Sequence, residues 1–260
     1  MLTLDAILRP SSLEEAHALA KSRASVVLGG ATFLRLGHRR VQKAIDLSGL
    51  GLDAIEEDES VLSLGAYVTY GDLSRHPLTR AYAGGVLVGA TDHIIGVQFQ
   101  NLVTIGGSVW GRYGFSDILP LLLALDAKVC LYPDGECSIE DFLCSPPTRG
   151  TILTHVLLPK NPPKVITRHF RRSTSEFPYA VIAYAKETNR LAIGARPQRA
   201  TLAPKTAMVL RESPEDLAAI EAALDEEVTF GSNARAGGEY RKLLCRNLLA
   251  QIGREARDEY

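Results

Sequence analysis

The chain has 260 residues, a formal net charge of −1, 46% hydrophobic residues and 23% charged residues. Such a composition is typical of a globular protein with a sizeable core, and it disfavours nucleic-acid or anionic-membrane partners, which need a concentrated basic face. No apolar run reaches the roughly 20 residues that span a bilayer, and the N-terminus lacks a basic segment followed by a long apolar one. We therefore expect a cytoplasmic protein with no membrane partner.

The four cysteines, Cys130, Cys137, Cys144 and Cys245, form no pair of the C-x2-C type. That spacing disfavours a zinc or iron-sulfur site, and the scattered histidines add no ligand pattern, so no metal site is predicted. In the cytoplasm these cysteines are expected to be reduced structural thiols.

In the first half of the chain, Ser12 to Glu15 fits a capping box, and apolar residues at helical spacing predict a helix over 12–22. A short buried strand is predicted over 26–28, ending at a Gly-Gly turn, and another over 44–47. No G-x-G-x-x-G motif is present and no long helix is expected at the glycines, which argues against a Rossmann domain.

Further strands are predicted over 61–64, 66–68, 127–132 and 152–158, and a small apolar helix over 80–95. A β-like run is predicted at Leu102, Val103 and Ile105, and it leads into a second Gly-Gly turn. The segment 118–125 is apolar on all sides, which predicts an enclosed helix.

Beyond the proline-rich segment 159–163 the pattern changes. Strands over 170–175, 181–184 and 191–193 predict a small antiparallel sheet, to which 208–210 could add an edge. Ser213 is the predicted cap of a helix, and a last helix over 240–252 is predicted to stop at Gly253. These features predict domains at 1–162, with subdomains of about 1–52 and 53–162, and at 163–260.

The two Gly-Gly turns share one chemistry. Each carries hydroxyl residues beside a glycine pair, as in Gly29-Gly30-Ala31-Thr32 and Thr104-Ile105-Gly106-Gly107-Ser108. Without a Cβ, main-chain N–H groups can approach an anionic ligand closely. We interpret the turns as two halves of a diphosphate cradle. The alternative is a pair of strand-ending turns that merely need positive φ.

The segments VLGGATFL and NLVTIGGS, followed by Phe115-Ser116-Asp117, closely resemble the FAD-binding (medium) subunits of molybdenum hydroxylases of the xanthine, carbon monoxide and nicotinate dehydrogenase family. Similarities at 170–173, 193–197 and 239–241 extend the resemblance over nearly the whole chain. It implies an α+β fold: a two-part FAD-binding domain of the vanillyl-alcohol oxidase (PCMH) type, then a small C-terminal α+β domain with a three-stranded antiparallel sheet and helices.

The resemblance also implies a set of FAD-binding residues, comprising the two turns, an apolar residue before the second turn and a short segment after it. These are Leu28, Gly29, Gly30, Ala31, Thr32, Phe33, Leu34, Ile94, Thr104, Ile105, Gly106, Gly107, Ser108, Ser116 and Asp117. Alternatives stay open for two of them: Asp117 could cap the helix that begins at Ile118, and Ile94 could be a core residue.

Three departures from the family pattern are Gln100 in place of arginine, Ser108 in place of asparagine, and Ala31 where a threonine, asparagine or histidine is common. Arg168, Arg171 and Arg172 either approach the flavin or a nicotinamide, or form a solvated basic patch.

The implied function is that of an oxidoreductase subunit without catalytic side chains. Electrons from a molybdenum-cofactor large subunit would arrive through a two-iron two-sulfur small subunit and pass through FAD to NAD+ or another acceptor. Two alternatives are a stand-alone FAD-dependent reductase or oxidase of the same superfamily, and a non-enzymatic scaffold that has lost FAD.

Overall fold

The computed structural model describes residues 2–94, 96–145 and 147–258, so Ile95, the last residue of the predicted helix 80–95, lies outside the described residues. The chain forms two compact units. The first unit comprises 1–80, 94–111 and 127–160, and the second comprises 81–93, 112–126 and 161–260. Both combine helices with sheets, which confirms the predicted α+β class.

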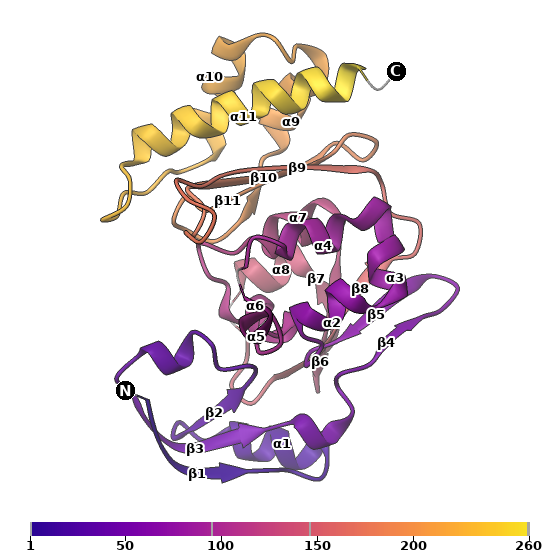
Figure 1. Cartoon of the computed structure of the whole chain (residues 1–260), viewed down its shortest axis with the longest axis vertical. Helices are drawn as coiled ribbons and strands as arrows, with labels where there is room; N and C mark the ends of the chain where they lie inside the picture. The colour runs from indigo at the N-terminus through magenta and orange to yellow at the C-terminus, as the bar shows by residue number, and fades with distance from the viewer. Residues whose placement is uncertain (1, 95, 146, 259–260) are drawn as a thin grey trace. The chain divides into compact units, whose positions relative to one another are not determined.

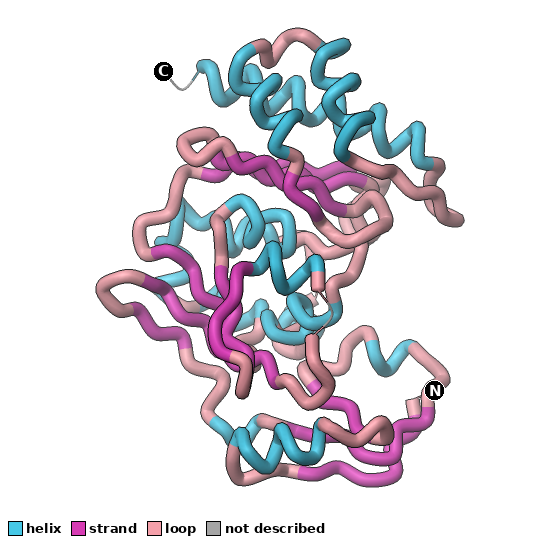
Figure 2. Tube along the Cα trace, turned by 180° about the vertical axis from the view of Figure 1, so that it is seen from behind, coloured by secondary structure: helices cyan, strands magenta, loops and turns pink. Residues whose placement is uncertain are grey.

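The first unit contains a three-stranded parallel sheet in the order β1-β3-β2, with helix α1 beside it (Figure 2). Its elements are β1 (Thr3–Leu8), α1 (Leu13–Ala20), β2 (Ser25–Leu28) and β3 (Arg40–Asp46). Ser12 caps α1 as predicted, and Ala16 packs with Ile45 in the core. Strand β1 was not predicted, because most of its side chains are exposed and it carries no apolar alternation.

The first unit also contains a five-stranded antiparallel sheet in the order β4-β5-β8-β6-β7. Its strands are β4 (Ile55–Glu57), β5 (Val61–Gly65), β6 (Lys128–Tyr132), β7 (Gly135–Ser138) and β8 (Ile152–Pro159). Its helices are α2 (Tyr70–Arg75), α5 (Val97–Gln100), α6 (Ile105–Gly111) and α8 (Ile139–Cys144). The predicted strand over 66–68 is wrong, because the chain turns after Gly65.

The second unit is built on an antiparallel sheet in the order β12-β11-β10-β9. Its strands are β9 (Val165–Phe170), β10 (Ala180–Ala185), β11 (Arg190–Gly194) and the short edge β12 (Thr201–Leu202). Because side chains alternate along a strand, Ile182 and Tyr184 pack in one core and Ala183 in another. This alternation lets helices cover both faces of the sheet.

Helices α4 (Val86–Thr91) and α7 (Ile118–Ala124) lie on one face of that sheet (Figure 1). Helices α9 (Pro204–Glu212), α10 (Leu217–Glu227) and α11 (Gly238–Asp258) lie on the other. All residues of α7 are buried, which confirms the predicted enclosed helix. Three sequence predictions fail here: the strand predicted over 170–175 overlaps β9 only at Phe170, 208–210 lies within α9, and α10 is capped by Asp216 instead of Ser213.

Glycine explains two further differences from prediction. The helix expected over 80–95 is broken into α3 (Pro77–Ala81), a 3-10 turn η3 (Tyr82–Gly85) and α4, because Ala83, Gly84 and Gly85 have positive φ. Helix α11 instead continues through Gly253, where a Cβ would lie 2.5 Å from the Pro214 Cβ. That glycine serves close packing, and it does not end the helix.

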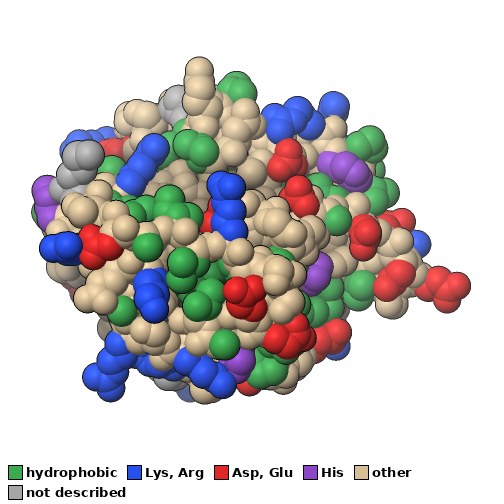
Figure 3. Space-filling model, turned by 90° about the horizontal axis from the view of Figure 1, so that it is seen from below, with side chains coloured by type: hydrophobic (Ala, Val, Ile, Leu, Met, Phe, Trp, Pro, Cys, Tyr) green, Lys and Arg blue, Asp and Glu red, His purple; other side chains and the backbone are tan. Residues whose placement is uncertain are grey.

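The described residues contain no helix with both the length and the apolar content needed to cross a bilayer. On the face shown in Figure 3, basic, acidic and apolar side chains are interspersed.

Candidate functional site

The first Gly-Gly turn follows directly on β2. The main-chain N–H groups of Gly29, Gly30, Ala31 and Thr32 donate to no acceptor within the described part of the chain. Ala31 adopts a positive φ of 50°. Since main-chain donors must be satisfied by protein, water or ligand, this turn offers consecutive donors to a bound anion.

The second Gly-Gly segment is the first turn of helix α6, and the β-like run expected before it is wrong apart from an isolated bridge between Thr104 and Thr69. The N–H groups of Ile105 and Gly106 donate at 2.9 Å to carbonyls of residues 68 and 66, and that of Gly107 donates to Thr104 Oγ1 at 3.1 Å. A helix start has N–H groups that need acceptors, and here the protein supplies them. The N–H groups of Ile105, Gly106 and Gly107 are therefore not left for a ligand, and the interpretation of the two turns as halves of one diphosphate cradle stays a prediction.

The two glycine segments are in contact. A Cβ on Gly29 would lie 2.7 Å from Thr104 Oγ1 and 3.3 Å from the Gly107 Cα. A Cβ on Gly30 would lie 1.3 Å from the Leu102 carbonyl oxygen, and one on Gly106 would lie 2.6 Å from Ala66. None of the four glycines has positive φ, so the alternative of turns that need that conformation is wrong. The glycines are required because main chain packs against main chain.

Tyr67 positions the first turn, and sequence reasoning did not find it. Its hydroxyl accepts the N–H of Leu47 at 2.9 Å and donates to the carbonyl of Leu28, the residue before Gly29. Burial raises the pKa of Tyr67 to about 12, so the hydroxyl keeps the proton that it donates. No motif marks this residue, because its partners are main-chain atoms.

Replacing Tyr67 with phenylalanine is expected to lower the free energy of unfolding by about 1–2 kcal/mol, because two part-buried main-chain groups lose their partner. Urea unfolding measures this difference. The control is Tyr132→Phe, which removes only a hydroxyl bonded to the exposed Glu14 carboxylate and should cost less than about 0.5 kcal/mol. Equal effects of the two variants would contradict the assigned role.

Three more residues of the first unit were predicted to bind FAD, and the structure shows the contacts or exposure of each: Ser108, Ile94 and Phe33. Ser108 Oγ accepts from the Tyr70 hydroxyl at 2.8 Å and donates to the Thr104 carbonyl at 3.0 Å. Gln100 Nε2 donates to the Ile94 carbonyl at 2.8 Å, which ties the half-buried Ile94 to α5. Phe33 is 41% exposed beyond the first turn.

In the second unit, Asp117 does not cap α7. Ser116 Oγ accepts the N–H of Leu119 at 3.3 Å, whereas the Asp117 carboxylate accepts a hydrogen bond from Arg171. Side chains of this pair are 11% and 6% exposed. Arg168 pairs with Glu255 on α11, and the exposed Arg172 lies 3.4 Å from Glu176, so the three arginines do not form one solvated patch.

Residues 3–161, more than half of the chain, match the family described as the FAD binding domain in molybdopterin dehydrogenase. The chain belongs to this family. Over 190 residues, 70% of each protein, it is 33% identical to the uncharacterized protein YgfM of Escherichia coli K12.

Three solved structures have the same fold as this chain. The crystal structure of Cu,Mo-CO dehydrogenase matches with a TM-score of 0.85 at 19% identity, covering 96% of both chains. Quinoline 2-oxidoreductase from Pseudomonas putida 86 matches with a TM-score of 0.84 at 19% identity, covering 100% of this chain and 98% of the other. Carbon monoxide dehydrogenase from Hydrogenophaga pseudoflava gives 0.83 at 20% identity, covering 94% of both. The family and fold implied by the sequence motifs are thereby confirmed.

The residues present fit a dinucleotide diphosphate. The unbonded N–H groups of 29–32 are suitable donors to phosphate oxygens, and any Cβ at Gly29 or Gly30 would collide with the segment that supports the turn. The second segment contributes that support, with the N–H groups of Ile105, Gly106 and Gly107 engaged by the protein.

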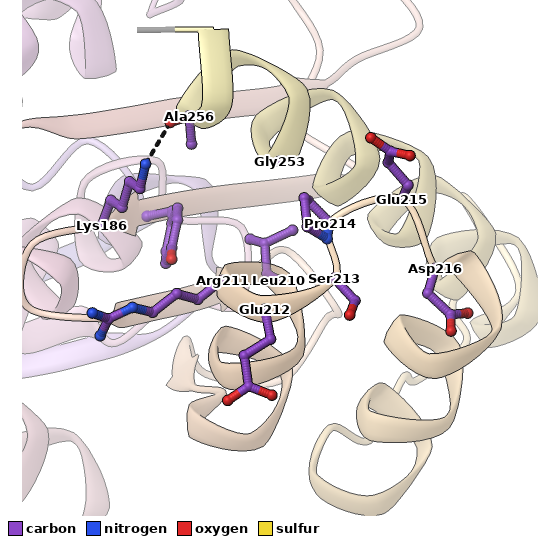
Figure 4. A pocket seen from close by; sticks show the side chains of 11 residues that line it. Lys186, Leu210, Arg211, Glu212, Ser213, Pro214, Glu215, Asp216, Gly253 and Ala256 are labelled. Carbon is purple, nitrogen blue, oxygen red and sulfur yellow. Dashed lines mark hydrogen bonds between the residues drawn. The ribbon is translucent and has the colours of Figure 1, made fainter. Parts of the chain in front are cut away.

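A larger hollow of about 690 Å³ in the second unit is not the candidate site (Figure 4). None of the residues predicted to bind the cofactor lines it. Lys186 and Arg211 lie on one side and Glu215 and Asp216 on the other, and Lys186 Nζ donates to the Ala256 carbonyl at 2.7 Å. Its mixed charge favours no single class of ligand.

Burial raises the pKa of Asp117 from 3.8 to about 6, because it outweighs the opposing effect of Arg171. A carboxyl with a raised pKa in the folded chain contributes its full stability below 3.8 and loses it as the pH rises through about 6. We expect the free energy of unfolding of the natural chain, relative to Asp117→Asn, to fall across this window. Urea unfolding at about pH 4 and about pH 7 measures it, and a constant difference would contradict the assignment.

Proposed function

We propose that this family member binds FAD with its diphosphate against the first Gly-Gly turn and acts as the electron-transfer subunit of a molybdenum hydroxylase. The observation that carries the proposal is the run of unbonded N–H groups at 29–32, held against the Gly106-Gly107 segment. Membership in a family of FAD binding domains supports the same cofactor.

In this proposal the chain's own residues hold and orient the cofactor. The N–H groups of Gly29 to Thr32 and the Thr32 hydroxyl donate to the diphosphate, while Gly107 allows the first turn to lie close and Gly106 allows its own segment to pack on Ala66. Tyr67 keeps the end of β2 in place. When bound, FAD supplies the redox chemistry, accepting and releasing electrons singly or in pairs.

The other predicted residues have supporting roles in the proposed site. Leu28, Phe33, Leu34 and Ile94 offer apolar surface, and Ser116 and Asp117 belong to the flavin end, with Asp117 held by Arg171. We also propose the domain boundary near residue 162, one residue past the end of the family match.

The proposed partners are a molybdenum-cofactor large subunit and a two-iron two-sulfur small subunit, with NAD+ or another compound as the final acceptor. The fold shared with a Cu,Mo-CO dehydrogenase chain over 96% of both chains supports assembly of this kind. The proposal makes the chain an oxidoreductase subunit whose side chains perform no acid-base or nucleophilic step.

The test combines absorption spectra with co-purification. The purified full chain, mixed with FAD and desalted, should retain the two absorption bands of oxidised flavin, and tagged chain should co-purify with a molybdenum and an iron-sulfur subunit from its source cells. If the chain folds but binds no FAD, the protein is a non-enzymatic scaffold. Rapid NAD(P)H turnover by the FAD-loaded chain, without partner subunits, would instead make it a stand-alone reductase.

A further inference from the structure

A second, smaller cavity of about 270 Å³ lies within the second unit. Thr167 and His169 on β9 are cross-strand partners of Ala183 and Val181 on β10, so the four share the sheet face that α4 and α7 cover. The cavity is completed by His93, just after α4, and by residues of α4 and α7.

Two histidines meet at this cavity. The ring centroids of His93 and His169 are 3.9 Å apart with the planes inclined at 55°, and neither ring has a hydrogen-bond partner within the described part of the chain. Burial, His93 and the nearby arginines lower the pKa of His169 to about 4, and burial and Arg171 lower that of His93. Both rings are therefore neutral at pH 7, and each has one N–H to donate.

Among the charged groups around the histidine pair, the Nε–H donor of Arg171 has no acceptor in the described chain. Asp117, on the α7 side, is bonded to Arg171, whose Nε is buried and has no hydrogen-bond partner. Arg168 is engaged by Glu255, and Asp92 adjoins His93 on the α4 side, where it opposes but does not overcome the lowering of the pKa of that histidine. Strand β10 carries no charged side chain.

The rest of the lining narrows the class of ligand. Ala90, Leu121, Val181 and Ala183 add apolar groups, and the lining also includes Asp117 and Arg168, each engaged in an ion pair. The cavity therefore combines N–H and O–H donors from His93, His169 and Thr167 with neighbouring hydrocarbon. A small molecule with a carboxylate at one end and an apolar group at the other satisfies both.

We propose that this cavity binds a small organic carboxylate, with the carboxylate accepting hydrogen bonds from the adjoining rings of His93 and His169 and its apolar part against Leu121 and Val181. The inference goes beyond FAD binding and does not depend on it. A bound anion stabilises imidazolium, so it raises the pKa of the histidine that it contacts.

The experiment follows the histidine ring protons of the full chain by NMR across pH, with benzoate and with its neutral analogue benzamide as probes. Saturating benzoate should raise the apparent pKa of His169. Half of the His169 rings should then be protonated at a proton concentration at least about tenfold lower than without benzoate. Benzamide should leave it unchanged. An unchanged midpoint with benzoate, or equal shifts with both probes, would overturn the proposal.

Variants and competing ligands complete the test. His169→Asn should abolish the response of His93 to benzoate, whereas His38→Asn, at an exposed position, should retain it. If His169→Asn does not fold, Thr167→Val should weaken benzoate binding severalfold. Inorganic phosphate that replaces benzoate fully would overturn the carboxylate class.

Parallel FAD titrations separate this inference from the proposed function. FAD that abolishes the benzoate response would assign the cavity to the cofactor and overturn the inference. A benzoate response in a folded chain that binds no FAD would contradict the proposed function and would leave this inference intact.

Discussion

Replacing Gly30 with alanine is expected to lower the free energy of unfolding by about 3 kcal/mol and to weaken FAD binding at least about tenfold. The new Cβ would lie 1.3 Å from the carbonyl oxygen and 2.4 Å from the carbonyl carbon of Leu102. Both atoms belong to the main chain, so no side-chain rotation relieves the collision and the turn must move. Urea unfolding of the FAD-free chain and flavin fluorescence titration measure the two effects.

Gly49→Ala is the matched control, because a Cβ there meets nothing within 4 Å and Gly49 does not have positive φ. It should change the free energy of unfolding by less than about 0.5 kcal/mol and leave FAD affinity as it is. A Gly30→Ala chain as stable as this control would show that the two segments do not pack as described. Preserved stability and tight FAD binding together would remove the basis of the proposed site.

Replacing Arg241 with methionine is expected to lower the free energy of unfolding by about 3 kcal/mol. The side chain is only 2% exposed, and its Nη1 donates to the carbonyls of Tyr179 at 2.9 Å and Ala195 at 2.7 Å. Nη2 donates to Asn233 Oδ1 at 2.9 Å. Methionine keeps much of the apolar stem but leaves these buried acceptors unsatisfied. Urea unfolding measures the loss.

The matched control is Arg254→Ala on the same helix, α11, where the side chain is exposed. It should cost less than about 0.5 kcal/mol. If Arg241→Met costs no more than the control, the hydrogen bonds of the guanidinium to the two carbonyls do not contribute to the stability of the fold.

Local sequence signals predicted the elements whose causes are local. Ser12 caps α1 because its hydroxyl reaches the N–H of Glu15 three residues on. Helix α7 was predicted because Ile118 to Ala124 is apolar all round, and strands β6 and β8 because their apolar residues fill the core. These signals depend on neighbours in sequence, so they survive without knowledge of the fold.

Sequence reasoning failed where a distant partner decides the outcome. Gly253 looked like a helix stop, yet it admits Pro214 to the surface of α11. For Asp117, which was predicted to bind FAD, the sequence left a helix cap open as the alternative, and the structure shows its carboxylate bonded to Arg171 instead of capping α7. In both cases the residue type allowed two roles, and only the three-dimensional packing chose between them.

By itself, the sequence determined that two glycine pairs with hydroxyl neighbours exist, and the family motifs around them. Only the tertiary structure decided which main-chain N–H groups of the two segments are bonded within the protein, because that depends on which acceptors lie near them. The carbonyls of residues 66 and 68 and the Thr104 hydroxyl accept the N–H groups of residues 105–107, while the N–H groups of 29–32 find no protein acceptor in the described chain. A main-chain donor carries no side-chain signature, so only the folded arrangement reveals which ones are left for a ligand.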